Sequence, residues 1–283
     1  MPSANTSYGT SQVADMLPVS ITAGNSPVVL GMPHTGTWLP AKIFEKLNDN
    51  GKKLADTDWH IDQLYDGLLP DATIVKANFH RYAIDANRDP SGVSLYPGQN
   101  TTSLCPLIDF DNVPIYLEGR EPDDAEIEQR RIAFHAPYHA ALKAELERVR
   151  QIHGVAILYD CHSIRSHISF LFEGKLPDFS IGTNNGETCA ASIEKAVEDA
   201  CLAAEGYSTV LNGRFKGGWT TRHYGQPETG IHAIQMELTQ SAYLATENLP
   251  FSYAPEKADL LRSHLKELLK QINDMATSGN LTD

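Results

Sequence analysis

Short apolar stretches alternate with longer amphipathic ones along this 283-residue chain. The short stretches are rich in β-branched residues and bounded by turn-forming or polar residues, a pattern typical of strands. They predict strands at 27–31, 72–77, 82–86, 155–159, 179–182 and 231–238. Apolar residues spaced three and four apart predict helices at 61–69, 138–152, 190–204 and 257–275, with Pro137 at the start of the second one. Strands that alternate with helices predict an α/β domain around a largely buried sheet.

Two stretches lack this patterning. Residues 1–18 are rich in Ser and Thr, and we expect them to form a loosely held arm before a single domain over 19–283. The segment 92–121 contains three prolines and little periodicity. Loops of this length are often functional, and the sequence leaves open whether this one is a lid.

Composition and charge narrow the function classes. The chain has 23 Lys and Arg against 36 Asp and Glu, a formal net charge of −13. Such acidity argues against a general nucleic-acid-binding surface and against binding to anionic membranes. An anionic substrate would need a few local Arg or Lys residues.

The chain shows no sign of a membrane span or a secretory leader. No stretch approaches the roughly 18 apolar residues of a spanning helix, and the N-terminal residues do not resemble a signal peptide. The four cysteines form no CxxC pair. We therefore expect a cytoplasmic protein with reduced thiols.

Three predicted strands lead into residues that can carry chemistry. The strand at 27–31 precedes His34, the strand at 155–159 precedes His162, and Glu237 lies near the end of the strand at 231–238. Ligands of α/β sheets bind beyond the carboxyl ends of strands, so we expect these side chains to meet. Imidazoles suit Zn²⁺, and a nearby carboxylate can act as the base for a hydrolytic water. The pattern indicates a metal-dependent hydrolase.

Each of these residues also has a structural interpretation. A single His at a strand end commonly makes an ordinary hydrogen bond, and Asp160 either orients His162 or caps a turn. Asp56 and Asp58 are each either the N-cap of the following helix or a third, oxygen ligand. Cys161 beside His162 suggests a cysteine hydrolase, but adjacent residues of a strand point to opposite faces.

Two basic stretches are candidates for binding an anion. Arg81, Asn87 and Arg88 flank the predicted strand at 82–86, and guanidinium groups bind carboxylates through paired hydrogen bonds. The alternative for each arginine is a surface ion pair with a neighbouring Asp. The stretch 212–225, NGRFKGGWTTRHYG, is interpreted either as a flexible basic loop near the site or as a plain hairpin turn.

Several common catalytic motifs are absent. The sequence contains no GxSxG, no GxGxxG, no GxxxxGKS and no HExxH. A nucleophile-elbow serine hydrolase and a nucleotide phosphate loop are therefore not indicated.

The motifs taken together resemble the N-formylglutamate amidohydrolase family. The matching pieces are PHTGTWLP at 33–40, DTDWHIDQLY at 56–65, FHRYAIDANRDPSG at 79–92, DCHSIRS at 160–166 and RFKGGWTTRHYGQPETGIHAIQMELTQSAYL at 214–244. They span most of the chain in the family's order. The family is related to zinc carboxypeptidase-like and aspartoacylase-like hydrolases, which implies a three-layer α/β/α sandwich around a mixed, largely parallel sheet.

The resemblance implies a zinc site, at which another divalent transition metal could replace Zn²⁺. His34 and His162 would be ligands. The wider superfamily has its acidic ligand three residues after the first His, where this chain has Thr37. We take Asp58 as the replacement, with Asp56 as the reserve.

The resemblance also implies how the substrate is handled. Glu237 would be the general base, and Arg81 would polarise the scissile carbonyl. Asn87 and Arg88 would hold one substrate carboxylate. Arg222 or Lys216 would hold the other.

The implied reaction is hydrolysis of N-formyl-L-glutamate, a small anionic N-acyl amino acid, to formate and L-glutamate, the last step of a histidine-degradation route. One alternative is a related zinc-dependent deacylase or small carboxypeptidase that removes a different acyl group. Another is a non-catalytic protein that binds amino-acid-like ligands on the same fold. His34, His162 and Glu237 are all present, which favours an enzyme.

Overall fold

The computed structural model describes residues 16–95, 98–279 and 281. Its centre is a seven-stranded sheet in the order β1-β3-β2-β4-β7-β5-β6. Strands β3, β2, β4 and β7 run parallel, β1 and β5 run antiparallel to β3 and β7, and β6 is parallel to β5. The strands are β1 (Val19–Thr22), β2 (Val28–Met32), β3 (Thr73–Ala77), β4 (Ala156–Ile164), β5 (Phe179–Gly182), β6 (Thr209–Leu211) and β7 (Ile231–Thr239).

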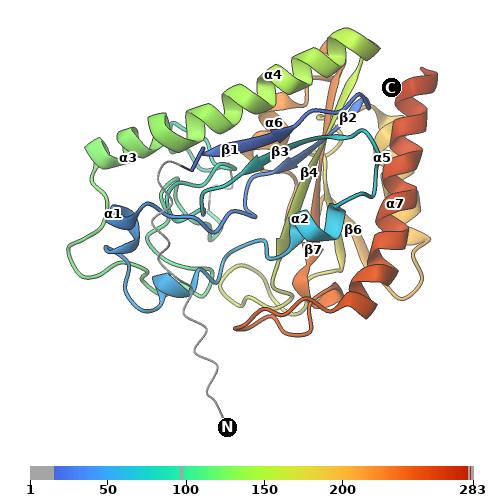
Figure 1. Ribbon diagram of the computed structural model, residues 1–283. Coiled ribbons are helices and arrows are strands. Elements are labelled where there is room, and N and C mark those ends of the chain that lie inside the picture. The colour runs from blue at the N-terminus through green and yellow to red at the C-terminus, as the bar shows by residue number, and fades with distance from the viewer. Residues whose placement is uncertain (1–15, 96–97, 280, 282–283) are drawn as a thin grey trace.

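Helices cover both faces of the sheet, which confirms the predicted α/β/α layers (Figure 1). One face packs against α2 (Ile61–Tyr65), α5 (Ala191–Leu202) and α7 (Pro255–Ser278). The other packs against α4 (Ala136–His153) and α6 (Trp219–Tyr224). Further helical segments are α1 (Ala41–Phe44), η1 (Gly51–Lys53), α3 (Asp124–Arg130), η2 (Arg131–His135), η3 (Pro227–Thr229) and η4 (Gln240–Ala242).

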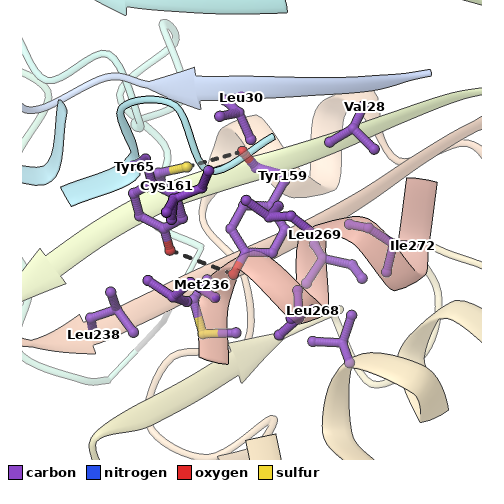
Figure 2. Close-up of a cluster of buried hydrophobic side chains, with 14 of the residues drawn as sticks. Val28, Leu30, Tyr65, Tyr159, Cys161, Met236, Leu238, Leu268, Leu269 and Ile272 are labelled. Atoms are coloured by element: carbon purple, nitrogen blue, oxygen red, sulfur yellow. Dashed lines mark hydrogen bonds between the residues drawn. The ribbon is translucent and has the colours of Figure 1, made fainter. Parts of the chain in front are cut away.

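The central strands divide their side chains between two cores. Tyr159 and Cys161 of β4 lie with Met236 and Leu238 of β7 in the core beneath α7 (Figure 2). The alternate residue Leu158 belongs to the core beneath α4. Because successive side chains of a strand point to opposite faces, the polar residues in register with Leu158 also face the α4 layer. The alternate residues Asp160 and His162 of β4 thereby lie on the side of the sheet away from the α7 core.

A continuous helical run from α3 through the π-helical turn η2 to α4 crosses one face of the sheet. The side chain of Asp123 caps its start by accepting a hydrogen bond from the Glu126 amide. The helix therefore begins upstream of Pro137, which was expected to start it. The wide π turn immediately before α4 relieves the clash that a proline ring makes with the preceding turn of a regular helix.

The predicted strand at 82–86 is wrong. This segment forms turns, although all five of its residues are buried. The Asp85 carboxylate accepts a hydrogen bond from the Asn87 amide at 2.8 Å, and the Asp85 carbonyl accepts one from the Arg88 amide. Hydrogen bonds between an Asp side chain and the nearby backbone compete with strand pairing. The apolar residues of this segment alternate because they are buried, although they form no strand.

Other differences concern short elements. The helix predicted at 61–69 ends at Tyr65, and the strands β1 and β6 and helices α3 and α6 were not predicted. Residues 1–15 of the expected arm lie outside the described residues, whereas the carbonyls of Leu17 and Pro18 accept hydrogen bonds from Asn78. No helix in the described ranges has the length and apolar character needed to cross a bilayer.

Candidate active site

The predicted site residues come together at the carboxyl ends of β2, β4 and β7. In the β4–β7 pairing, His162 lies directly opposite Glu237, and Asp160 lies opposite Gln235. All four share the α4 side of the sheet by the strand period of two. His34 follows β2, the other neighbour of β4. The sheet register itself therefore sets these side chains beside one another.

His34, Asp58 and His162 form a buried cluster of potential metal ligands. The two Nδ1 atoms of His34 and His162 are 3.2 Å apart. An Asp58 carboxylate oxygen, Oδ2, lies 3.2 Å from Nδ1 of His162 and 3.7 Å from Nδ1 of His34. Donor atoms around a tetrahedral ion with bonds of about 2.0–2.1 Å are about 3.3 Å apart. The donor set and its spacing fit a Zn²⁺-sized ion.

Both imidazoles are oriented through their second nitrogen. Nε2 of His34 contacts the Asp85 carboxylate at 2.7 Å, and Nε2 of His162 contacts the Asp160 carboxylate at 3.1 Å. Metal-binding histidines are commonly held in this way by a carboxylate. Although burial opposes the charged ring, Asp160 and Asp58 raise the pKa of His162 well above its usual range.

Asp58 reaches the cluster from a loop tied to the end of β2. Its amide donates to the His34 carbonyl at 3.1 Å, and its Oδ1 accepts from Arg81 at 2.7 Å. Burial disfavours the charged carboxylate, but Arg81, His162 and His34 together outweigh burial and lower the Asp58 pKa. Thr37 is exposed. Asp58, and not Thr37, therefore supplies the carboxylate of this cluster.

Asp56, the reserve ligand, lies elsewhere. Its Oδ2 accepts hydrogen bonds from the Tyr82 hydroxyl at 2.9 Å and the Phe110 amide at 3.0 Å. It does not belong to the ligand cluster found among the described residues. Burial raises its pKa to about 7, against the opposing effect of Arg81.

Glu237 is buried and, like His34 and His162, lines a cleft at this edge of the sheet. Its carboxylate accepts a hydrogen bond from the Gln235 side chain at 3.2 Å, and Gln235 in turn accepts one from the Gly218 amide at 2.7 Å. Burial raises the Glu237 pKa to about 8, with His162 and Arg81 opposing the shift. A buried carboxyl with a raised pKa suits a group that accepts and later returns a proton.

The turn that carries Asn87 and Arg88 borders the cluster. The Asn87 side-chain nitrogen lies 3.2 Å from Nε2 of His162, and its oxygen accepts from the Thr220 amide at 2.9 Å. A side chain on Gly218 would approach the Asn87 amide group to within 2.3 Å. Gly218 is therefore required by the close contact between α6 and this turn.

Three side chains of the α3–η2–α4 run support the backbone of the same turn. Arg130 donates to the Ala83 carbonyl at 3.0 Å. His139 contacts the Ala86 carbonyl at 2.8 Å, and His135 contacts the Arg88 carbonyl at 3.1 Å. Burial lowers the pKa of both histidines, to about 3 for His139. The two neutral rings donate hydrogen bonds to backbone carbonyls that have no strand partner in this turn.

This cleft opens above the ligand cluster. Arg81, Arg88 and Arg214 supply its basic lining, and Phe110, Ile164, Leu171 and Phe215 its apolar lining. Among the residues that the structure describes, Lys216 and Arg222 do not line it. The Arg222 Nε donates instead to the Gly217 carbonyl at 2.8 Å. Residues 219–224 form α6, so the stretch 212–225 is neither wholly a loop nor a hairpin turn.

Cys161 has no place in this chemistry. Its sulfur lies in the core beneath α7, donates to the Tyr159 carbonyl at 3.5 Å, and is fully buried (Figure 2). Burial raises its thiol pKa well above the usual range. His162 faces the opposite side of the sheet, so the two do not form a nucleophile–base pair.

Sequence reasoning missed three contributors to the site. Asp85 was considered only as an ion-pair partner of an arginine, yet it orients His34. Gln235 holds Glu237, and its position two residues earlier on the same strand was the available signal. Arg214 was noted within a basic stretch, with nothing in that stretch to mark it out from its neighbours.

Comparisons with known proteins identify the family of this chain. The model of the N-formylglutamate amidohydrolase family matches residues 26–244. N-formylglutamate deformylases of Pseudomonas aeruginosa and Pseudomonas putida are 43% and 44% identical over 255 residues, covering 90% of this chain and 95% of each relative. The crystal structure of an N-formylglutamate amidohydrolase from Ralstonia eutropha superposes with a TM-score of 0.77 at 26% identity, covering 93% of this chain and 100% of that one. The chain belongs to the N-formylglutamate amidohydrolase family.

Proposed function

We propose that this protein hydrolyses N-formyl-L-glutamate to formate and L-glutamate, with a divalent metal ion held by His34, Asp58 and His162. The observation that carries the proposal is the buried cluster of these three residues beside Glu237, in a cleft lined by arginines. The names of the relatives supply the substrate.

A bound divalent ion would act as a Lewis acid on the scissile carbonyl and would favour ionisation of a water. Glu237 accepts the proton of the attacking water as the new carbon–oxygen bond forms. It then delivers this proton to the nitrogen as the carbon–nitrogen bond breaks. Formate and the free amine of glutamate leave.

Two arginines of the cleft, Arg81 and Arg88, would contact different parts of the substrate. The Arg81 guanidinium is fixed by Asp58, lines the cleft, and would stabilise the negative charge that develops on the formyl oxygen. Arg88 donates to the Thr102 carbonyl at 3.0 Å and to the hydroxyls of Thr101 and Thr102, so its fork is held in place. Its fixed positive charge at the cleft attracts a carboxylate, and we assign one substrate carboxylate to Arg88 together with Asn87.

The test is formate release from N-formyl-L-glutamate by purified protein before chelation, after chelation, and after Zn²⁺ is restored. Metal content is measured at each stage. Release that disappears with the metal and returns with Zn²⁺ supports both the reaction and the ligand cluster. Release that persists after verified metal removal would contradict the metal role and leave the substrate assignment standing.

Acyl specificity is measured with N-acetyl-L-glutamate as the matched substrate. The formyl compound is expected to be hydrolysed and the acetyl compound to react much more slowly. Hydrolysis of the acetyl compound with no formate released from the formyl compound would replace this proposal with a broader deacylase activity.

A further inference from the structure

The proposed substrate carries two carboxylates, and the turn at Asn87 and Arg88 accounts for one. Sequence reasoning gave the other to Lys216 or Arg222, which do not line the cleft within the described part of the chain. Arg214 does line it. Arg214 is therefore the basic residue of the 212–225 stretch that can reach a ligand in this cleft.

Arg214 is fixed at its end of the cleft by two carbonyl groups. Its Nε donates to the Leu171 carbonyl at 2.8 Å, and one terminal nitrogen donates to the Asn100 carbonyl at 2.8 Å. The guanidinium carbon also lies 5.2 Å from the centre of the Phe215 ring. These contacts orient a planar group before any ligand arrives, which reduces the ordering entropy that binding costs.

The short segment 100–102 links Arg214 to Arg88. Arg214 bonds the carbonyl of Asn100, whereas Arg88 bonds both Thr101 and Thr102. Asn100 is itself anchored by its side chain, which donates to the Phe170 carbonyl at 2.7 Å. Two basic groups of one cleft are thus bonded to adjacent residues of a single segment.

The environment of Arg214 also suits the rest of a glutamate side chain. Leu171 and Phe215 line the cleft beside it and offer apolar contact to methylene groups. A ligand with a charged end, a short apolar stem and a second charged end matches this arrangement.

We propose that Arg214 binds the side-chain carboxylate of the substrate and makes the enzyme select N-formyl amino acids with an acidic side chain. This inference rests on the proposed function. In it, Arg88 holds the carboxylate next to the scissile amide, and Arg214 holds the carboxylate at the far end of the side chain.

The test compares kcat/KM for N-formyl-L-glutamate with kcat/KM for N-formyl-L-glutamine, which has nearly the same shape but no side-chain charge. In the variant Arg214→Met, which keeps an apolar stem against Phe215, the ratio should fall about 30-fold. A loss of about 30-fold corresponds to about 2 kcal/mol, the low end of the cost of removing one partner of a buried hydrogen-bonded charge pair. We expect the low end because Arg214 is only half-buried. Arg214→Lys keeps the charge without the fork and should give an intermediate ratio.

Arg120→Ala is the matched control, since it removes one positive charge from an exposed position. Its ratio should equal that of the wild type. An equal loss on both substrates in the Arg214 variants would make Arg214 a support for segment 100–102 and would overturn the proposal. A ratio that collapses in Lys216→Ala instead would overturn it as well, because Lys216 would then bind the carboxylate.

Failure of the proposed function looks different. In that case the wild-type protein releases formate from neither substrate, whatever residue stands at position 214.

Discussion

Asp56 provides a test of the electrostatics around the site that does not depend on turnover. Its carboxyl group is buried, and its Oδ1 has no hydrogen-bond partner among the described residues. Burial raises its pKa from 3.8 to about 7. The folded protein therefore binds this proton more tightly than the unfolded chain does. The free energy of unfolding is therefore highest at low pH, and it falls as pH rises from the pKa of the unfolded chain towards the pKa of the folded protein.

The size of the effect follows from the two pKa values. A carboxyl with pKa 3.8 unfolded and about 7 folded lowers the free energy of unfolding by about 2.5 kcal/mol between about pH 5 and about pH 8. Asp56→Asn removes this titration, and its amide oxygen can still accept from the Tyr82 hydroxyl and the Phe110 amide. Over that pH range, the free energy of unfolding of the variant should fall by about 2.5 kcal/mol less than that of the wild type.

The assay is urea-induced unfolding of metal-free wild type and Asp56→Asn at both pH values. Glu237 also titrates in this range, so the informative quantity is the difference between the two proteins. Parallel pH profiles would refute the claim that burial makes this carboxyl retain its proton. Metal content of the zinc-loaded variant should equal that of the wild type. A loss of zinc would return Asp56 to the ligand set.

The remaining predictions concern chemistry, metal binding and support of the substrate turn. Glu237→Gln should lower kcat about 10²–10⁴-fold with zinc content unchanged, because it removes the proton acceptor; near-normal turnover would make Glu237 structural. Asp58→Asn should reduce bound zinc, measured by mass spectrometry of metal after dialysis, and full occupancy would remove Asp58 from the ligands. His139→Ala leaves the Ala86 carbonyl without its 2.8 Å partner, which should lower unfolding free energy by about 1–3 kcal/mol. It should also raise KM for N-formyl-L-glutamate, with partial rescue by His139→Gln; a stability loss at unchanged KM would limit His139 to a structural role.

The sequence predicted the central strands because they are buried on both faces and appear as unbroken apolar runs. His34, His162 and Glu237 were found by one rule, that chemistry collects where such strands end. The rule had no means of choosing between Asp56 and Asp58, because both lie in one loop. Their difference arises from a tertiary contact, the bond between the Asp58 amide and the His34 carbonyl.

The turn at 82–88 could not be predicted from local pattern. Its residues are as buried as those of a strand, and its carbonyls are bonded by Arg130, His135 and His139 from a helix far along the chain. The sequence did not single out Arg214 for a similar reason. Its position at the cleft depends on its bond to segment 100–102, which lies far away along the chain. Side chains that act through distant partners leave no periodic signal.

The direct pairing of His162 with Glu237 across two neighbouring strands has a consequence for how this enzyme can change over evolution. The proposed metal ligand His162 and the proposed base Glu237 take their spacing from the sheet, about 4.8 Å between strands, and lose it only if the sheet itself is rebuilt. Arg88 and Arg214 stand on loops, where insertions and substitutions are tolerated far more readily. A duplicated copy of this gene can therefore acquire a new amino-acid preference through its loops while its hydrolytic machinery is inherited intact.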